Sequence, residues 1–126
     1  MKNKKYRIEK DSMGNMKVPN DSMYGAQTQR AIENFPISNI AFDINFIYAM
    51  VIIKRSAAIV NNKLNLLAAN KKNAIKDACD SILDGDYDNH FPIDIFQTGS
   101  GTSTNMNVNE VIARIATIKS KFEIHP

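Results

Sequence analysis

The residues best suited to chemistry stand near the end of the sequence, in the stretch FQTGSGTSTNMNVNE at positions 96–110. Gly99 and Gly101 flank Ser100, Thr102 follows directly, and a helical pattern of apolar residues resumes soon afterwards. The first backbone amides of a helix have no partner within it and lie at the positive end of its dipole, so they stabilise an anion. Glycines let the backbone approach such a ligand closely, and hydroxyls add donors. These residues predict a site for a small anion, with a purely structural Gly-Ser turn as the open alternative.

Two nucleotide-binding motifs do not fit this stretch. A P-loop requires Gly-Lys-Ser/Thr, and no lysine occurs between Gly99 and Glu110. The dinucleotide fingerprint requires a third glycine where Thr104 stands, and a βαβ pattern that this sequence lacks. No base is spaced to activate Ser100 as a nucleophile. Nucleotide binding and nucleophilic catalysis are therefore disfavoured.

Metal, imidazole and thiol chemistry receive less support than anion binding. Asp84, Asp86 and Asp88 alternate as in a calcium loop, but the glycine and the distant glutamate of such a loop are missing. His90 has no partner at a metal-ligand spacing, and Cys79 stands among apolar residues without a second cysteine. The sequence therefore favours a solvated acidic loop, a core cysteine, and no metal or cofactor.

Composition limits the number of domains that the chain can form and the partners that it can bind. The 126 residues are 44% hydrophobic, which suits one domain with a core but little room for an enclosed active site. Sixteen Lys and Arg against 13 Asp and Glu give a net charge of +3, and KNKK and NKKN supply much of the excess as solvated ends. Neither run makes a nucleic-acid stripe. Without an apolar leader or about 18 uninterrupted apolar residues, a cytoplasmic protein with no membrane partner is expected.

A small hairpin and a short helix are predicted at the beginning of the chain. Apolar and charged residues alternate within residues 1–20 on both sides of a turn at Gly14–Asn15, which indicates two paired strands. The remainder, 21–126, is predicted to be helical. Its first helix would be capped by Asp21 or Ser22 and would end before the next proline.

Three further helices complete a mainly α fold. The clearest is predicted over 43–65, capped by its first residue. Its apolar residues cover more than one face, so we expect neighbours on several sides; the stripe comprises Phe46, Ile47, Met50, Ile53, Ala57, Val60 and Leu64. Another helix is predicted over about 70–83, with its stop at Gly85. It should pack antiparallel to the helix over 43–65. The last helix follows the anion stretch, and a capping pair of Asn107 and Glu110 leaves its first residue open.

Three blocks of this sequence resemble the class II fumarases of the fumarase/aspartase superfamily. FQTGSGTSTNMNVNEVIA resembles their first signature region, RIEKDSMGNMKVPNDSMYGAQTQRAIENFPIS resembles their N-terminal segment, and the terminal His-Pro resembles the start of their His-Pro-Asn-Asp motif. Aspartate ammonia-lyases usually have Gly-Val-His-Thr where this chain has GAQT, and Gly-Ala-Gly-Thr where it has GSGT. The resemblance covers nearly the whole chain and favours fumarase within the superfamily.

The resemblance implies a fold, a reaction and site residues. It identifies 1–126 as a single N-terminal domain of an enzyme that reversibly hydrates fumarate to (S)-malate in the tricarboxylic acid cycle, without a cofactor. Ser100, Gly101 and Thr102 would contact a substrate carboxylate, and His125 would belong to an accessory dicarboxylate site. The implied partners are fumarate or malate, the enzyme's remaining domains and the other subunits of a homotetramer, because three subunits form each active site in this family.

The resemblance also shows what these residues do not contain. The central helical bundle, the C-terminal domain and the blocks with the family's catalytic histidine, serine and lysine have no counterpart here, so no catalytic residue is assigned and the chain alone is expected to be inactive. Arg114 and Ile115 stand where the family often has Asn-Arg, and Phe122 lies where some members have an arginine for the accessory site. Another lyase of the superfamily, or a non-catalytic helical interaction module, stays open as an alternative.

Overall fold

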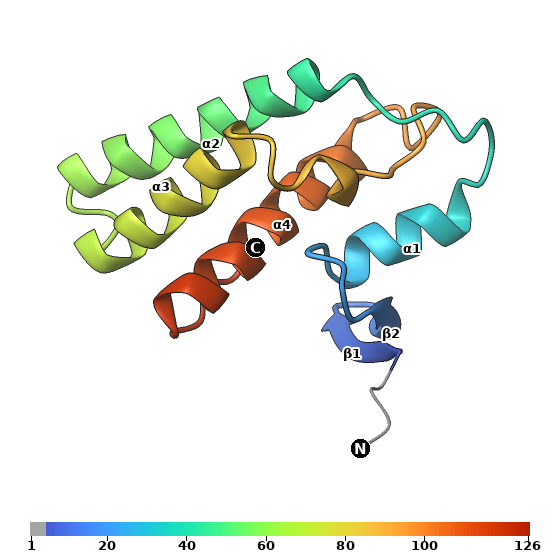
Figure 1. Ribbon diagram of the computed structural model, residues 1–126, viewed down its shortest axis with the longest axis horizontal. Coiled ribbons are helices and arrows are strands. Elements are labelled where there is room, and N and C mark those ends of the chain that lie inside the picture. Colours follow the sequence, from blue (N-terminus) through green and yellow to red (C-terminus); the bar gives the residue numbers. More distant parts are fainter. Residues whose placement is uncertain (1–4) are drawn as a thin grey trace.

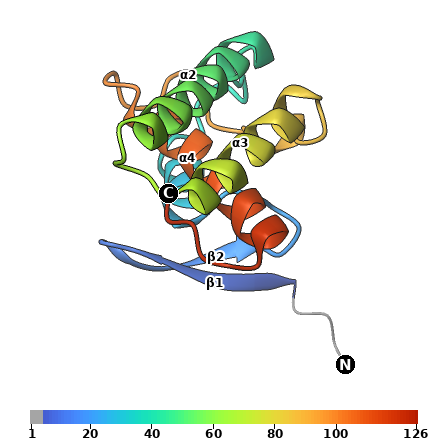
Figure 2. The ribbon, with the colours of Figure 1, turned by 90° about the vertical axis from the view of Figure 1, so that its left-hand side faces the viewer.

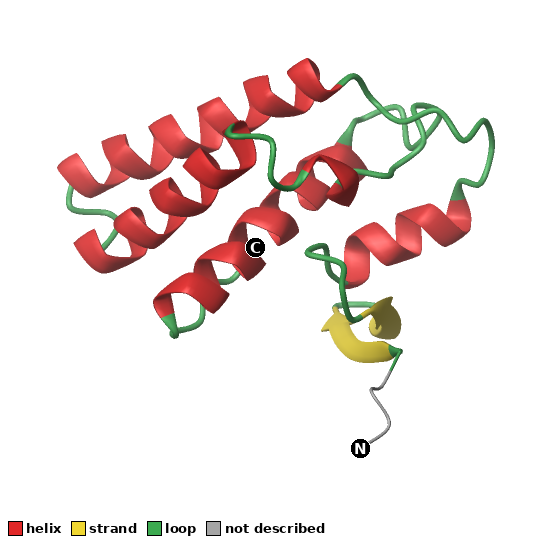
Figure 3. Cartoon of the chain, in the orientation of Figure 1, coloured by secondary structure: helices red, strands yellow, loops and turns green. Residues whose placement is uncertain are grey.

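The computed structural model describes residues 5–126 as a two-stranded hairpin followed by four α-helices (Figures 1 and 3). This arrangement confirms the predicted mainly α fold. The elements are β1 (Tyr6–Asp11), β2 (Gly14–Pro19), α1 (Ala26–Asn34), α2 (Ile44–Lys63), α3 (Ala69–Leu83), the 3-10 helix η1 (Asp88–His90) and α4 (Thr102–Ser120).

The hairpin forms where the alternating pattern predicts it, but its turn lies slightly earlier. Asp11 pairs with Gly14 in the antiparallel ladder, so the connection falls just before the predicted turn at Gly14–Asn15. The Asp11 carboxylate accepts the Met13 amide at 2.9 Å, a local bond that favours this turn. Gly14 has φ of 118°, which a side chain would disfavour. Residues 1–4 of the predicted hairpin lie outside the described part.

Helix α1 begins later than its sequence suggests, because Arg7 holds the preceding backbone in another conformation. The guanidinium of this β1 residue donates to the carbonyls of Pro19, Ser22 and Tyr24 at 2.6, 2.9 and 2.6 Å. Carbonyls that converge on one cation cannot also run parallel along a helix axis. The prediction that Asp21 or Ser22 caps this helix is therefore wrong, and Gly25 occupies the N-cap position.

Helix α4 occupies the centre of the fold. It lies against α1 and α3, and Figure 2 shows the hairpin on one side of it and α2 on the other. Buried side chains from β2, α2, α3, α4 and the loop after α3 form one core, and Ile32 of α1 packs against it partly buried. The core includes Val18, Ile47, Val51, Ala78, Ile82, Phe91, Val108, Val111, Ile115 and Ala116. Cys79 belongs to this core as predicted, and burial raises the pKa of its thiol to about 12. The thiol is thus protonated at neutral pH.

Local sequence signals correctly predict where α2 starts and where α3 stops. The Asp43 carboxylate accepts the Asn45 amide at 2.8 Å, which confirms the predicted cap of α2. Gly85 has φ of 91° just after α3, where it was expected to end that helix. The two helices lie side by side in opposite directions (Figure 1).

The apolar stripe predicted on α2 is largely uncovered within this chain. Phe46, Ile53 and Val60 are 49%, 65% and 50% exposed, whereas the side facing the core carries Val51 and Ala58. Among the described residues, α2 is also the one helix whose length and composition would suffice to cross a membrane. That is weak evidence, because helices of soluble proteins meet the same criterion.

The acidic loop after α3 contains a short 3-10 helix rather than fully irregular chain. The Asp88 carboxylate accepts the Tyr48 hydroxyl at 2.7 Å, so this loop is tied to α2. In the part of the chain that the structure describes, no group of three or more His, Cys, Asp and Glu side chains is placed to hold a metal ion.

His90 fastens this loop to the segment before α1 and makes folding sensitive to pH. Its Nδ1 accepts the Met23 amide at 3.2 Å, and its carbonyl accepts Asn107 Nδ2 at 3.0 Å. Burial lowers the pKa of His90 despite the opposing charge of Asp21. A depressed pKa means that the folded state prefers the neutral ring. Its stabilisation is complete above the unfolded-state pKa of about 6.5 and is lost as the pH falls through the lower folded-state value.

We therefore expect the free energy of unfolding to decline between neutral and mildly acidic pH. His90→Asn keeps an acceptor near the Met23 amide but removes the titrating ring, so it should weaken this decline. Urea denaturation at several pH values measures the effect, with the exposed His125→Asn as matched control. An unchanged pH dependence in His90→Asn would contradict the assignment.

Candidate functional site

The predicted anion stretch forms a tight turn that runs directly into α4. The Gly101 amide donates to the Thr98 carbonyl at 3.0 Å, and the Gly101 carbonyl accepts the Asn105 amide at 3.1 Å. Gly101 has φ of 74°, a left-handed conformation that costs other residues roughly 1 kcal/mol or more. The sequence thus places glycine where the backbone turns into the helix, and α4 begins at Thr102.

The structure brings Ser100, Gly101 and Thr102 together at the N-terminus of α4. The Ser100 and Thr102 hydroxyls are exposed and lie 3.1 Å apart. Within residues 5–126, no acceptor bonds the backbone amides of Thr102 and Ser103. The first turn of this 19-residue helix carries no acidic side chain. Free amides, two hydroxyls and the positive end of a helix dipole form a suitable setting for one carboxylate.

A buried glutamine closes the turn, a contact that the sequence analysis missed. Gln97 Oε1 accepts the Thr104 amide at 2.9 Å, and Gln97 Nε2 donates to the Thr104 hydroxyl. Both side chains are buried, with 9% and 3% exposed. The available signal was weak: an amide residue stands at the start of the glycine stretch, seven positions before a threonine.

The turn is anchored on its other side by the buried carboxylate of Asp94. This carboxylate accepts the amides of Phe96, Ser38 and Asn39 at 2.9, 2.6 and 2.9 Å. Burial alone would raise the pKa of Asp94, but these hydrogen bonds outweigh it and the pKa is lowered. The Ile95 amide also reaches the segment before α2, so two distant loops lie side by side (Figure 1).

One cation approaches the first turns of α4 from α2. Lys54 Nζ donates to Asn105 Oδ1 at 2.7 Å, across a partly buried contact. Asn105 stands three residues after Thr102. Lys54 therefore adds positive charge to the helix end that carries the free amides.

Glu110 does not begin α4, so the alternative capping pair with Asn107 is wrong. It lies in the middle of the helix, where it is 6% exposed, and caps α1 instead. Its carboxylate accepts the amides of Gly25, Gln27 and Thr28 at 2.9, 2.8 and 3.0 Å, and the Thr28 hydroxyl at 2.6 Å. The carboxylate of α4 thus satisfies the free amides at the start of α1.

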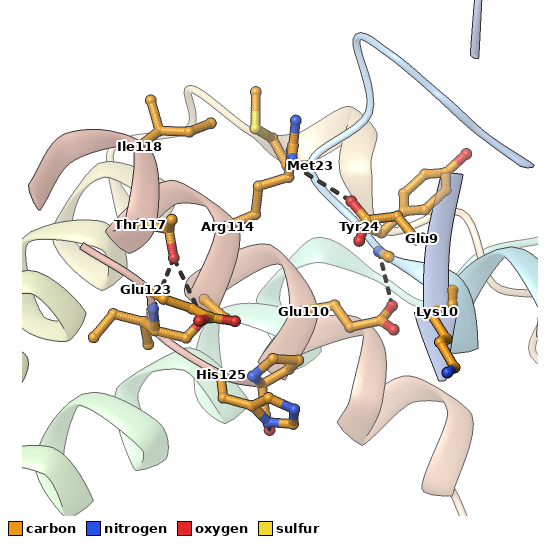
Figure 4. A pocket seen from close by; sticks show the side chains of 15 residues that line it. Glu9, Lys10, Met23, Tyr24, Glu110, Arg114, Thr117, Ile118, Glu123 and His125 are labelled. Carbon is orange, nitrogen blue, oxygen red and sulfur yellow. Dashed lines mark hydrogen bonds and ion pairs between the residues drawn. The ribbon is translucent and has the colours of Figure 1, made fainter. Parts of the chain in front are cut away.

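His125 lies away from the anion turn, beside a separate cavity of about 310 Å³ (Figure 4). The charged residues that line this cavity are Glu9, Lys10, Glu110, Arg114, Glu123 and His125. Three carboxylates outnumber the two permanent cations, so the charge of this cavity does not favour the binding of a dianion. Arg114 Nε is buried and has no hydrogen-bond partner in the part of the chain that the structure describes, while Nη1 of the same side chain donates to Glu9 Oε1 at 3.5 Å. The charge of the cavity thus gives little support to the predicted accessory dicarboxylate site.

Comparisons with known proteins agree with the resemblance in the sequence. A family model described as a lyase matches residues 14–125. The chain is 53% identical to a class II fumarate hydratase from Prochlorococcus marinus, over 98% of this chain and 28% of the relative. It is 55% identical to the class II fumarate hydratase of Campylobacter jejuni, over 89% of this chain and 24% of that protein. The chain therefore spans about a quarter of the length of these curated relatives.

Solved structures share the fold as well as the sequence. A native fumarate lyase:delta crystallin from Brucella melitensis matches with a TM-score of 0.88 and 42% identity, over 94% of this chain and 28% of that one. A class II fumarase from Schistosoma mansoni matches with a TM-score of 0.88 and 38% identity, over 96% of this chain and 26% of that one. The hairpin and the four helices are thus arranged as in longer lyases.

Proposed function

The chain belongs to the lyase family that contains class II fumarate hydratases, and we propose that it forms one wall of a site that hydrates fumarate to (S)-malate. The observation that carries this proposal is the turn at Ser100–Thr102. It presents two free amides and two hydroxyls at the start of α4, within the stretch that resembles a fumarase signature. A carboxylate of fumarate or malate is the ligand that we assign to it.

In the proposed reaction, these donors would stabilise negative charge on the substrate carboxylate. In the malate-to-fumarate direction, a proton leaves the carbon next to a carboxylate, and the resulting negative charge spreads into that carboxylate. The hydroxyl group then leaves the neighbouring carbon as water, with a proton from a general acid, and the alkene forms. Fixed donors around the carboxylate stabilise charge as it develops, which is electrostatic catalysis. The general acid and base must come from outside these 126 residues, so we expect no turnover by the chain alone.

We assign the exposed face of α2 to the remaining parts of a tetrameric, cytoplasmic enzyme. Phe46, Ile53, Val60 and Leu64 recur at helical spacing on this face and are 49–65% exposed. Exposed apolar stripes of this kind suit packing against further helices. The relatives continue for about three quarters of their length outside the matched segment, which would supply such helices.

A chimeric enzyme tests the proposed function. Residues 1–126 would replace the matching segment of the Prochlorococcus marinus fumarate hydratase, and fumarate hydration and aspartate deamination would be measured in a host without either activity. Hydration by the chimera and none by the 126-residue chain is the expected result. A correctly assembled chimera that deaminates aspartate, or that hydrates nothing, would exclude the hydratase assignment.

The α2 assignment is tested in the same chimera. Ile53→Lys should lower the fraction of tetramer, measured by sedimentation, because a charge would be buried in an apolar interface. Met13→Lys, at a 74% exposed position of the hairpin turn, is the control and should leave assembly unchanged. Equal assembly of the two variants would remove α2 from the interface.

A further inference from the structure

We propose that Gln97 is a positioning residue for catalysis, which holds the Ser100–Thr102 turn in the geometry that binds a carboxylate. The inference rests on the proposed function of that turn. Within residues 5–126, both hydrogen bonds of the Gln97 side chain go to Thr104, so Gln97 acts on the turn through Thr104.

The contacts of Gln97 close a ring around the turn. Both ends of its side-chain amide bond to Thr104, so the residue before the turn is fixed to the first helical turn after it. The bond from Gly101 to Thr98 lies inside this ring. Two nested closures leave the intervening backbone few conformations, which reduces the entropy lost when a ligand binds.

Gln97 also decides which amides are left for a ligand. The amides of a helix's first turn compete for any nearby acceptor. Gln97 Oε1 accepts from the amide of Thr104, and the Gly101 carbonyl accepts from that of Asn105. Within residues 5–126, the first-turn amides of Thr102 and Ser103 are left without an acceptor. Two adjacent donors match the two oxygens of a single carboxylate.

The side chain has to supply an acceptor without negative charge. Methionine would fill the same volume without any hydrogen bond, and the buried Thr104 amide would then lose its partner. Glutamate could accept from both the Thr104 amide and its hydroxyl, but it would add a negative charge beside the site of an anion. Glutamine combines neutrality with the required acceptor and donor.

Kinetics of the chimera test the functional part of the inference. Gln97→Met should lower kcat/KM about tenfold to a hundredfold, as expected for a misplaced binding group, with kcat per folded enzyme clearly reduced. Gln97→Glu should retain more of kcat than Gln97→Met does but raise KM, which a merely structural role would not produce. Gln29→Met is the matched control, because within residues 5–126 the side-chain amide of Gln29 makes one hydrogen bond, which Nε2 donates to Glu33 on the same helix α1. Unchanged kinetics in a folded Gln97→Met chimera would overturn the inference.

Amide hydrogen exchange in the 126-residue chain separates this inference from the proposed function. The Thr104 amide should exchange faster in Gln97→Met than in the parent, while core amides of α4 such as that of Ile115 stay protected. An inactive parent chimera would refute the hydratase proposal without touching this result. Equal exchange at Thr104 in both proteins would overturn the role of Gln97 whatever the activity of the chimera.

Discussion

Replacing Thr102 by valine in the chimeric enzyme is expected to lower kcat about 100- to 1000-fold, the usual effect of removing one donor from a site of developing negative charge. The hydroxyl lies 3.1 Å from that of Ser100 at the start of α4. Valine has nearly the same shape, so the change removes a donor while the packing is kept. Steady-state kinetics with fumarate and with malate measure the loss.

Stability separates this effect from damage to the fold. The Thr102 side chain is exposed, so Thr102→Val should change the free energy of unfolding by no more than about 0.5 kcal/mol. Thr102→Ser retains the hydroxyl and should recover most of kcat. Full activity in Thr102→Val, or equal losses in both variants, would remove this hydroxyl from the carboxylate site.

The features that sequence predicts well are those fixed by neighbouring residues. The cap at Asp43 and the stop at Gly85 depend on one side chain or one backbone conformation, and both lie where expected. The turn into α4 is of the same kind, because Gly101 permits the left-handed backbone that Thr102 follows. The candidate anion site could therefore be recognised before any tertiary contact was known.

The features that sequence reasoning missed depend on residues far away in the chain. The start of α1 is set by Arg7 and Glu110, which bind its preceding carbonyls and its first amides. The exposed side of α2 has a related cause. A helix that is apolar on most of its surface carries no periodic signal for which side meets the core, and α3 and α4 decide it. The clamp by Gln97 likewise requires the folded turn.

The largest effect on stability is expected at Glu110, whose carboxylate joins α4 to α1. Glu110→Gln should lower the free energy of unfolding by about 2–4 kcal/mol, because an NH₂ group would face donors that now bind a carboxylate oxygen. The four bonds come from Gly25, Gln27 and Thr28. Urea denaturation of the 126-residue chain measures the change, and an effect below 1 kcal/mol would contradict it.

Three further variants tie this loss to the cap of α1. Glu123→Gln changes an exposed carboxylate beside the same cavity and should stay within about 0.5 kcal/mol of the parent. Gly25→Ala should destabilise as well, because an added Cβ would lie 3.0 Å from the Glu110 carboxyl group. Glu110→Ala removes that obstacle. In the Glu110→Ala background, Gly25→Ala should therefore lower the free energy of unfolding by less than it does in the parent. Additive effects in this double-mutant cycle would show that the carboxylate and the start of α1 are not coupled.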